Sequence, residues 1–430
     1  MSLRFDIETD RPLVRKESRT RYVLARIVAP EGKPRQRPPV NLALVLDRSG
    51  SMAGEKIRLA KEAAVSALRR LEPRDRLAVV FYDDRIDVVV PSAPATSETV
   101  ESAVRAIRDV EPRASTNLCG GWMRGCEQVA LVETPGAVRR VILLTDGLAN
   151  AGITDPSEIA GHAAELRHRG IATTTIGVGH DFDEHLLGGM ADAGGGNFYY
   201  VEHAEQITSS IETEVGEALE VTLREAWLRV GPASLAEVTP VAPYRTRRAG
   251  DDWIIELGDL VSLQEMAVPL RIAFTPNALA DPAKPAVGLT FALGASSTVA
   301  AEAVVQWRVA STAEVGAQAR NRGVDHAVAE AYAALARREA GRLNRAGDFD
   351  AARERLARTR ARISSYAGDD SVLNELMRKL ERDAEAHAGA MSASALKRSY
   401  SVSRSALTSR SPSGASRRAA PDKGDGSKVS

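Results

Sequence analysis

Five consecutive apolar residues, Leu42–Leu46, run directly into the loop Asp47-Arg-Ser49-Gly-Ser51. The run is too short to span a membrane as a helix. Its boundaries are turn formers, a pattern typical of a strand buried on both faces of a parallel sheet. Ligands of open α/β sheets bind at the carboxyl ends of the strands. One carboxylate and two hydroxyls at alternate loop positions therefore predict a cradle for a hard divalent cation.

From Val40 to about Ala218, strand-length apolar runs alternate with stretches of helical periodicity. This alternation predicts a multidomain α/β protein with a doubly wound, mainly parallel, Rossmann-like sheet over residues 38–218. Two further oxygen donors, Thr116 and Asp146, fall where later segments of this unit reach the same sheet edge. The predicted metal ligands are Asp47, Ser49, Ser51, Thr116 and Asp146. Such an oxygen-only set favours Mg²⁺ (Mn²⁺ and Ca²⁺ are the alternatives) over Zn²⁺, and it leaves one coordination position open.

The segments around this unit predict three other kinds of structure. Residues 1–37 hold two strand-like runs, and residues 219–310 hold five more, separated by Pro, Gly and Asn, which favours an antiparallel β-sandwich. Two strands alone bury too little to be stable, so the α/β unit is expected either to be inserted in the sandwich or to precede it. Residues 312–390 predict a helical hairpin or bundle, with helices near 323–346, 348–366 and 370–388. Residues 391–430 are rich in Ser and Arg and predict a disordered tail.

Charge and cysteine content narrow the class of protein. Lys plus Arg number 57 and Asp plus Glu number 57, so no global field favours nucleic acid, and no specific nucleic acid is expected as a partner. The first residues lack the apolar core of a signal peptide, and no apolar run is long enough for membrane insertion. Only Cys119 and Cys126 occur, which points to a reducing compartment. A cytoplasmic protein is expected.

The segment of roughly residues 40–218 resembles a von Willebrand factor type A (VWA) domain with a metal-ion-dependent adhesion site. The matching motifs are Asp47-x-Ser49-x-Ser51, Thr116 in Ser-Thr-Asn-Leu, Asp146 in Leu-Leu-Thr-Asp-Gly, and the run from Thr174 to Leu187. The first three of these motifs, separated in the chain and in the right order, make this resemblance specific. The flanking segments are similar to bacterial cytosolic members distantly like inter-α-trypsin inhibitor heavy chains and calcium-activated chloride-channel regulators.

The resemblance implies binding without catalysis. In such sites the Asp and Ser residues hold the cation, and an Asp or Glu carboxylate of a partner protein completes its coordination. The counterpart of Thr116 can move to bind the metal directly when a ligand arrives. Arg48 departs from the apolar or small residue of many members. It is expected to be either a rim charge that attracts an acidic partner or a solvated loop charge.

Two other groups of residues have simpler structural explanations. Cys119 and Cys126 lie on one helical face about 10 Å apart along the axis, too far to form a disulfide, so they are expected to pack as apolar side chains. A second group resembles a metal cluster, but a helix N-cap with acidic first-turn residues explains its carboxylates. Its members are His180, Asp181, Asp183, Glu184 and His185.

The predicted tail is the second region with a functional interpretation. From Lys397 onward it carries eight Lys and Arg and two Asp, a net charge of +6. Ser401 and Ser413 lie downstream of arginines, as many basophilic kinases prefer, so phosphorylation could dock the tail on a phosphopeptide reader. A solubilising tail is the plainer interpretation.

The sequence therefore predicts a non-catalytic, cation-dependent scaffold that binds a partner protein. One alternative is a kinase-regulated signalling adaptor that acts through Ser401 and Ser413. The other is a metal-assisted hydrolase, although no well-placed histidine accompanies the motif as a general base.

Overall fold

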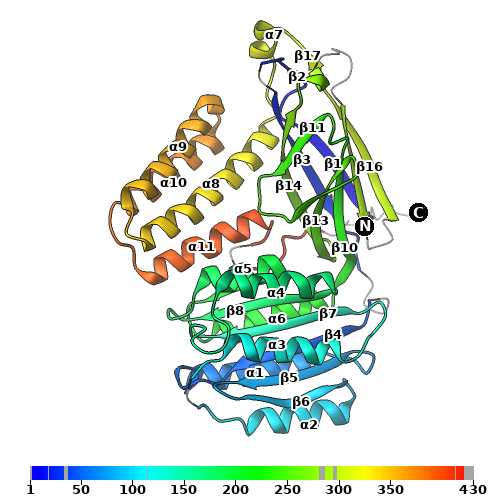
Figure 1. The fold of residues 1–430 in the computed structure, drawn as a ribbon, viewed down its shortest axis with the longest axis vertical. Helices are drawn as coiled ribbons and strands as arrows, with labels where there is room; N and C mark the ends of the chain where they lie inside the picture. The colour runs from blue at the N-terminus through cyan, green and yellow to red at the C-terminus, as the bar shows by residue number, and fades with distance from the viewer. Residues whose placement is uncertain are drawn as a thin grey trace, which may run out of the picture.

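The computed structural model describes residues 2–17, 19–32, 37–113, 115–279, 286–293, 298–411 and 413–420. It contains an α/β domain, a β-sandwich stacked on one end of that domain, and a group of long helices beside both (Figure 1). The predicted fold class is confirmed.

The α/β domain is built on a six-stranded sheet with strand order β6-β5-β4-β7-β8-β9, in which only β6 is antiparallel. All eight residues of the central strand β4 are buried, as expected for a strand covered on both faces. The strands are β4 (Val40–Asp47), β5 (Arg76–Tyr82), β6 (Ile86–Pro94), β7 (Val138–Thr145), β8 (Ile171–Val178) and β9 (Gly195–Val201).

Six helices cover this sheet, three on each face. The first face carries α1 (Glu55–Leu68), α2 (Ser97–Arg108) and α6 (Gln206–Ala218). The second face carries α3 (Leu118–Ala130), α4 (Pro156–His168) and α5 (Glu184–Gly194). Because every parallel strand ends at the same edge, the loops after β4 and β7 meet there, opposite to the edge at which β4 begins after its connection from the sandwich.

The β-sandwich contains strands from both sides of the α/β domain. One sheet has the order β1-β3-β14-β11, and the other has the order β12-β13-β10-β15-β16. The first comprises β1 (Arg4–Thr9), β3 (Thr20–Val28), β14 (Glu265–Phe274) and β11 (Ala236–Pro240). The second comprises β12 (Thr246–Ala249), β13 (Asp252–Val261), β10 (Val221–Gly231), β15 (Ala286–Leu293) and β16 (Thr298–Gln306). Since β3 pairs with β14 from Thr20 to Val28, the α/β domain is an insertion between β3 and β10.

The helical region packs against the outer face of the first sandwich sheet. It comprises α7 (Thr312–Ala317), α8 (Arg322–Arg345), α9 (Phe349–Ala367), α10 (Ser371–Ala386) and α11 (Ala393–Leu407), and the short β2 (Leu13–Val14) pairs with β17 (Arg308–Val309) before it. Leu24 of β3 packs on Val324 and Val328 of α8.

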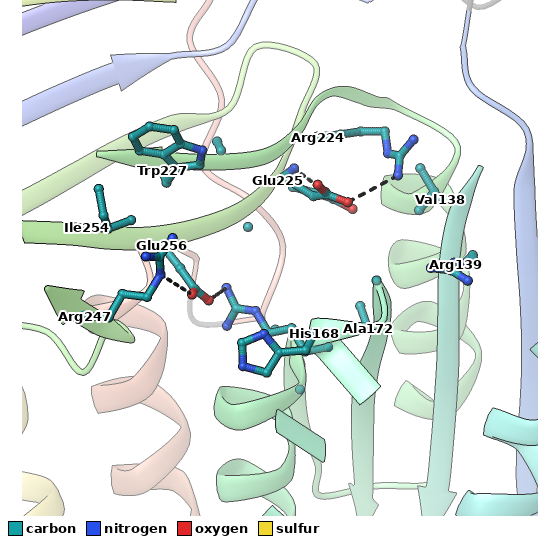
Figure 2. A pocket seen from close by; sticks show the side chains of 17 residues that line it. Val138, Arg139, His168, Ala172, Arg224, Glu225, Trp227, Arg247, Ile254 and Glu256 are labelled. Carbon is teal, nitrogen blue, oxygen red and sulfur yellow. Dashed lines mark hydrogen bonds and ion pairs between the residues drawn. The ribbon is translucent and has the colours of Figure 1, made fainter. Parts of the chain in front are cut away.

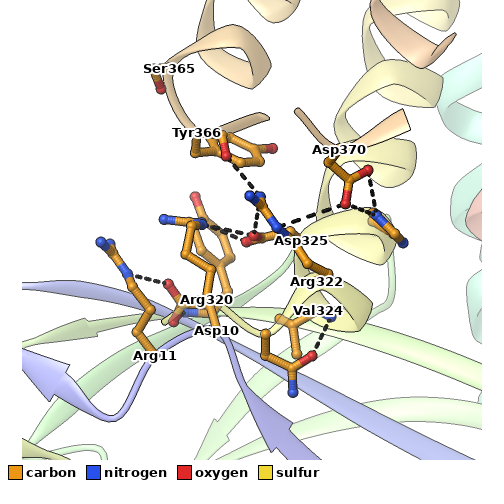
Figure 3. Close-up of polar contacts among 12 residues, drawn as sticks. Asp10, Arg11, Arg320, Arg322, Val324, Asp325, Ser365, Tyr366 and Asp370 are labelled. Atoms are coloured by element: carbon orange, nitrogen blue, oxygen red, sulfur yellow. Dashed lines mark hydrogen bonds and ion pairs between the residues drawn. The ribbon is translucent and has the colours of Figure 1, made fainter. Parts of the chain in front are cut away.

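Polar contacts fix the start of α8 beside the N-terminal strands (Figure 3). Arg320 binds the buried carboxylate of Asp325 with two hydrogen bonds of 2.7 and 2.5 Å, and its guanidinium stacks 4.7 Å from the Tyr366 ring. Arg322 donates to the Tyr366 carbonyl at 2.9 Å. Charge-assisted bonds of this kind are the strong ones, and here they hold the start of α8 against α9. Asn321 joins it to the N-terminal strands, because its amide donates to the Asp10 carbonyl at 2.9 Å and its side chain donates to Glu8 at 2.7 Å.

The predicted disorder of residues 391–430 is wrong for the described part of that segment. Residues 393–407 form α11, whose Leu396, Tyr400 and Leu407 are buried. Residues 408–411 and 413–420 then run between the α/β domain and the sandwich. There the Glu265 amide donates to the Arg417 carbonyl at 2.8 Å, and the Ala419 amide donates to the Leu263 carbonyl at 2.9 Å. Residues 421–430 lie outside the described residues.

Ion pairs with distant residues explain why the prediction of disorder was wrong. The basic residues that made this segment look like a solvated tail form ion pairs with acidic residues of the α/β domain. The pairs are Lys397–Glu184 at 2.9 Å, Arg404–Asp192 at 2.8 Å, Arg410–Glu217 at 2.8 Å, Arg418–Glu220 at 2.6 Å, and Arg398–Glu202. The acidic partners lie far away in the sequence, so the local composition of the segment does not reveal them.

Lys397→Met is expected to loosen α11. The Lys397 ammonium is 2% exposed, donates to the Phe182 carbonyl at 2.5 Å and to Glu184 at 2.9 Å, and lies 4.1 Å from the Phe182 ring centroid. Losing hydrogen bonds to a buried charge costs about 2 kcal/mol, which is about a thirtyfold rise in local opening. Hydrogen exchange of the α11 amides measures this rise, and the exposed Lys379→Met on α10 is the control. Unchanged exchange would show that α11 is held by its apolar residues alone.

Candidate metal centre

Asp47 stands at the middle of the carboxyl edge of the sheet, because β4 lies between β5 and β7. Its side chain is fully buried. Asp47 Oδ1 accepts a hydrogen bond from the Ser49 amide at 2.8 Å, and Oδ2 accepts one from the Thr145 hydroxyl at 2.7 Å. Burial raises the pKa of Asp47, Asp146 adds to the increase, and the Thr145 and Ser49 donors oppose it. The loop therefore holds a carboxylate in a fixed orientation at a desolvated position.

Two more oxygen donors follow Asp47 on its loop, and they lead to Asp146, which comes directly after β7. Ser49 Oγ lies 3.1 Å from Ser51 Oγ, and Ser51 Oγ donates to Asp146 Oδ1 at 2.7 Å. Residues Gly50–Met52 form a single 3-10 turn, which brings the two serine hydroxyls to the same side. Asp146 is 1% exposed, whereas Ser51 is exposed. The row of oxygens is therefore buried at Asp146 and open to solvent at Ser51.

Thr116 reaches the same edge from the link that precedes α3. Its amide donates to Asn150 Oδ1 at 3.3 Å, and a Cβ placed on Gly147 would lie 3.5 Å from the Thr116 hydroxyl. Thr116 therefore lies beside the residue that follows Asp146. The link itself is held by backbone bonds from Arg113 to the Arg48 carbonyl and from Asn117 to the Asp83 carbonyl, both of 2.8 Å. The structure thus brings all five predicted residues to one place.

The spacing of these oxygens fits a six-coordinate cation. Mg²⁺ prefers octahedral geometry with metal–oxygen distances of about 2.1 Å, so neighbouring ligands lie about 3 Å apart. The Ser49–Ser51 and Ser51–Asp146 separations are 3.1 and 2.7 Å. All five side chains are oxygen donors, and in the described part of the chain no three His, Cys, Asp or Glu residues cluster as metal ligands. Metal binding by these residues stays a prediction, and the donor set is consistent with it.

Arg48 lies in neither of the two environments expected for it. It is neither a rim charge nor a solvated one, because it is 4% exposed. Its Nε donates to Asp83 at 2.8 Å and its Nη2 to Asp87 at 2.5 Å, while Arg113 binds the same two carboxylates at 3.0 and 2.8 Å. Although burial raises the pKa of Asp83, the Arg85 amide and the two arginines lower it below its ordinary value. The Arg48 cluster ties the Asp47 loop to the link that carries Thr116.

Arg48→Met is expected to destabilise the domain by about 2 kcal/mol, because the buried Asp83 loses one of its two arginines. Urea unfolding measures the loss. Arg85→Met in the same turn is the control, because that side chain is exposed. Equal midpoints for the two variants would contradict a positioning role for Arg48.

Two residues of the centre were missed by the sequence analysis. Thr145 supplies the hydroxyl that fixes Asp47, and its position directly before Asp146 was the available signal. Lys56, in the first turn of α1, donates to Asp146 Oδ2 at 2.5 Å and to the Ser51 carbonyl at 3.3 Å. Its side chain is 30% exposed. An ammonium group therefore lies beside the buried carboxylate of Asp146.

The remaining candidates have structural roles. Cys119 and Cys126 are buried, free and part of the core beneath α3. Burial raises the pKa of both thiols. Asp183 caps α5 by accepting from the His185 and Leu186 amides at 2.8 and 3.2 Å. Glu184 is buried against Lys397 and Arg345. These residues pack and cap as expected.

The candidate site thus belongs to an α/β domain in which helices cover a mainly parallel sheet and an oxygen-donor loop lies at the carboxyl edge. Residues 41–213 match the family model of the von Willebrand factor type A domain. The chain therefore contains a VWA domain, and the predicted resemblance is confirmed.

Several known proteins are similar to this chain in sequence or in structure. YfbK of Escherichia coli (strain K12), an uncharacterized protein, is 27% identical over 226 residues, which covers 52% of this chain and 39% of YfbK. Inter-alpha-trypsin inhibitor heavy chain H1 of Mesocricetus auratus is 32% identical over 171 residues, 38% of this chain and 19% of that protein. The chain thus spans well under two thirds of these relatives. A solved structure, a von Willebrand factor type A protein from Catenulispora acidiphila, covers 96% of this chain and is itself covered to 97%, with a TM-score of 0.68 at 17% identity.

The similarity to the Catenulispora acidiphila structure shows that the whole arrangement of sandwich, α/β domain and helices recurs as a fold. Across the described ranges, none of the helices combines the length and apolar character that a membrane span requires.

Proposed function

We propose that the Asp47 centre holds a divalent cation, Mg²⁺, and that the chain is a non-catalytic interaction module whose centre captures an Asp or Glu carboxylate of a partner protein. The observation that carries the proposal is the row of Ser49, Ser51 and Asp146 oxygens at ligand spacing, buried on one side and open at Ser51. When bound, the cation supplies a Lewis-acidic position for the incoming carboxylate.

The protein's own residues provide the rest of this function. Asp47 and Asp146 supply the negative charge that attracts the cation, and the serine hydroxyls and Thr116 supply neutral donors. The Thr145 hydroxyl and the Ser49 amide keep Asp47 in one orientation. A centre with only two carboxylates keeps the cation electropositive, which suits capture of a third carboxylate from outside.

Titration calorimetry with Mg²⁺ and Mn²⁺ tests the first half of the proposal. The unchanged protein is expected to bind, and Asp47→Ala to lose detectable binding. Asp84→Ala is the matched control, because Asp84 is an exposed aspartate in the turn after β5. Equal heats for Asp47→Ala and the unchanged protein would overturn the site.

Affinity capture from the native cell, in Mg²⁺ and in EDTA, tests the second half. A true partner is released by EDTA, is not captured by Asp47→Ala, and loses binding when one of its own acidic residues is replaced. Binding that is independent of metal and of Asp47 would refute the proposal.

No specific observation favours either alternative function. The described contacts of the five ligands include neither a histidine nor a third carboxylate that could activate water. Phosphorylation stays a prediction: Ser413 is exposed, whereas Ser401 is half-buried on α11. Phosphosite mapping on protein purified from growing cells decides it, and an unmodified Ser413 would argue against the adaptor.

A further inference from the structure

A cavity of about 320 Å³ separates the α/β domain from the sandwich, at the end of the sheet opposite to the Asp47 centre. The starts of β7 and β8 and the end of α4 form its lower side, and β10, β12 and β13 form its upper side (Figure 2). A second cavity of about 100 Å³ adjoins it, since both are lined by Arg167, Gly195, Glu256 and Asp259. The volume is in the range of small-molecule sites.

Guanidinium groups outnumber carboxylates around these cavities. Three of them share the single carboxylate of Glu256 without a close contact: Arg167 at 3.5 Å, Arg245 at 4.0 Å and Arg247 at 4.0 Å. A fourth, Arg139, donates to the Arg169 carbonyl and makes no ion pair with a described residue. These five groups carry a net charge of +3 in a chain whose total is zero.

The other carboxylates of the cavity do not offset this surplus. Glu225 lies 3.6 Å from Arg224, and Asp259 lies 3.9 Å from Arg140, so each has an arginine of its own. Figure 2 shows the Arg224–Glu225 pair apart from the Glu256 group. Burial lowers the pKa of Arg167, and the charge of Arg245 adds to this effect. Closely spaced guanidinium groups of this kind are stabilised when an anion binds among them.

Two buried polar atoms at the adjoining cavity have no hydrogen-bond partner among the described residues. They are Arg245 Nη1 and the Tyr244 hydroxyl, and both residues line that cavity. A buried donor without a partner costs about 1–3 kcal/mol, so each one marks a position where an acceptor is missing. Burial alone raises the pKa of Tyr244, so at neutral pH its hydroxyl keeps its proton and can donate.

The backbone leaves room for the arginines where the two domains meet. Gly170 and Gly195 have φ angles of +75° and +69°, and a Cβ on either would lie 2.6 Å from Arg139 Nη2 or 2.8 Å from Arg167 Nε. Glycine is the residue that adopts this conformation without strain. On the upper side of the cavity, Trp227 and Ile254 supply apolar surface (Figure 2).

We propose that this interdomain cavity, together with the smaller one that adjoins it, is a binding site for a phosphate-bearing small molecule. Arg139, Arg167, Arg245 and Arg247 bind the phosphate oxygens, with Tyr244 as a further donor, and the uncharged part of the molecule packs against Trp227 and Ile254. The site is independent of the Asp47 centre and of any cation held there.

Calorimetry with inorganic phosphate and with ADP, on the full chain in EDTA, tests this site. Removing the metal excludes binding through the Asp47 centre. ADP is expected to bind more tightly than phosphate because it adds apolar contact. Arg139→Gln/Arg247→Gln is expected to weaken ADP binding about a hundredfold, since two charge-assisted contacts are lost. Arg248→Gln is the matched control: Arg248 follows Arg247 on β12, is equally exposed, and does not line the cavity.

Each outcome decides the proposal. Binding that survives in Asp47→Ala, fails in the double variant and persists in Arg248→Gln supports it. Failure of both phosphate and ADP to bind the unchanged protein at millimolar concentration overturns it, as does equal binding by the double variant. A thermal melt of each variant shows that it is folded under the conditions of the titration.

Discussion

Glu214→Ala is expected to lower the free energy of unfolding by about 3–5 kcal/mol, because it removes the close counterion of the buried Arg140 and leaves that charge only Asp259 at 3.9 Å. Glu214 of α6 is fully buried and accepts four hydrogen bonds. Arg140 donates at 2.7 Å, Thr174 at 2.6 Å, Asn197 at 2.8 Å and Tyr199 at 2.9 Å. Arg140 is 5% exposed, and water cannot replace the lost carboxylate at low cost.

Urea unfolding measures this loss, and Glu205→Ala is the control, since Glu205 precedes the same helix and is exposed. A loss below about 1 kcal/mol, the range of a surface pair, would show that water enters and solvates Arg140.

The same carboxylate makes stability depend on acid. Although burial raises the pKa of Glu214, Arg140 and Arg410 together with the hydrogen-bond donors lower it below its ordinary value. A group with a lowered folded-state pKa stabilises the protein above its unfolded pKa of about 4.3, and the stabilisation disappears as the pH falls through the folded pKa. The unchanged protein should therefore lose more stability than Glu214→Ala between pH 5 and pH 3, and urea unfolding at the two pH values measures the difference.

Lys56→Met is expected to change two affinities in opposite directions, given the proposed metal-dependent function. The Lys56 ammonium lies 2.5 Å from Asp146 and competes with an incoming cation, so its removal should tighten Mg²⁺ binding about tenfold, or about 1.4 kcal/mol. The charge of the loaded centre falls from +1 to zero in this variant, because Mg²⁺ balances only Asp47 and Asp146. Capture of a carboxylate should therefore weaken about tenfold.

Calorimetry with Mg²⁺, followed by titration of a peptide bearing one Glu at saturating Mg²⁺, measures both effects. Lys61→Met is the matched control, because this lysine is on the same helix but donates to the Arg108 carbonyl at 2.9 Å. If both affinities move in the same direction, Lys56 does not set the charge of the centre.

The residues that could be predicted from sequence are those whose neighbours follow from strand order. The apolar run before Asp47 specified a buried parallel strand, and the carboxyl edge of a parallel sheet specified where Thr116 and Asp146 would meet it. Only the type of each residue and its position after a strand were needed, so the fold class and the gathering of the candidate ligands could be predicted.

The two predictions that were wrong concern residues whose ion-pair partners lie far away in the sequence. Arg48 was expected in solvent because nothing near it in the chain reveals Asp83 and Asp87. The C-terminal segment was expected to be disordered because its composition is basic and rich in serine, while Glu184 and Glu217 lie about 200 residues earlier in the printed sequence. Burial of a charge is decided by its counterion, and local periodicity contains no information about a counterion in another domain.

The insertion of the α/β domain between β3 and β10 has a mechanical consequence. Both connections to the sandwich leave from the amino edge of the sheet, while the Asp47 centre is at the carboxyl edge. If the proposed partner binds, a pull on the centre loads β4 lengthwise between β5 and β7, to which it is paired from Asn41 to Asp47 and from Val40 to Leu46. The hydrogen bonds of both ladders would then share the tension in shear, a geometry suited to the proposed capture of a partner under force.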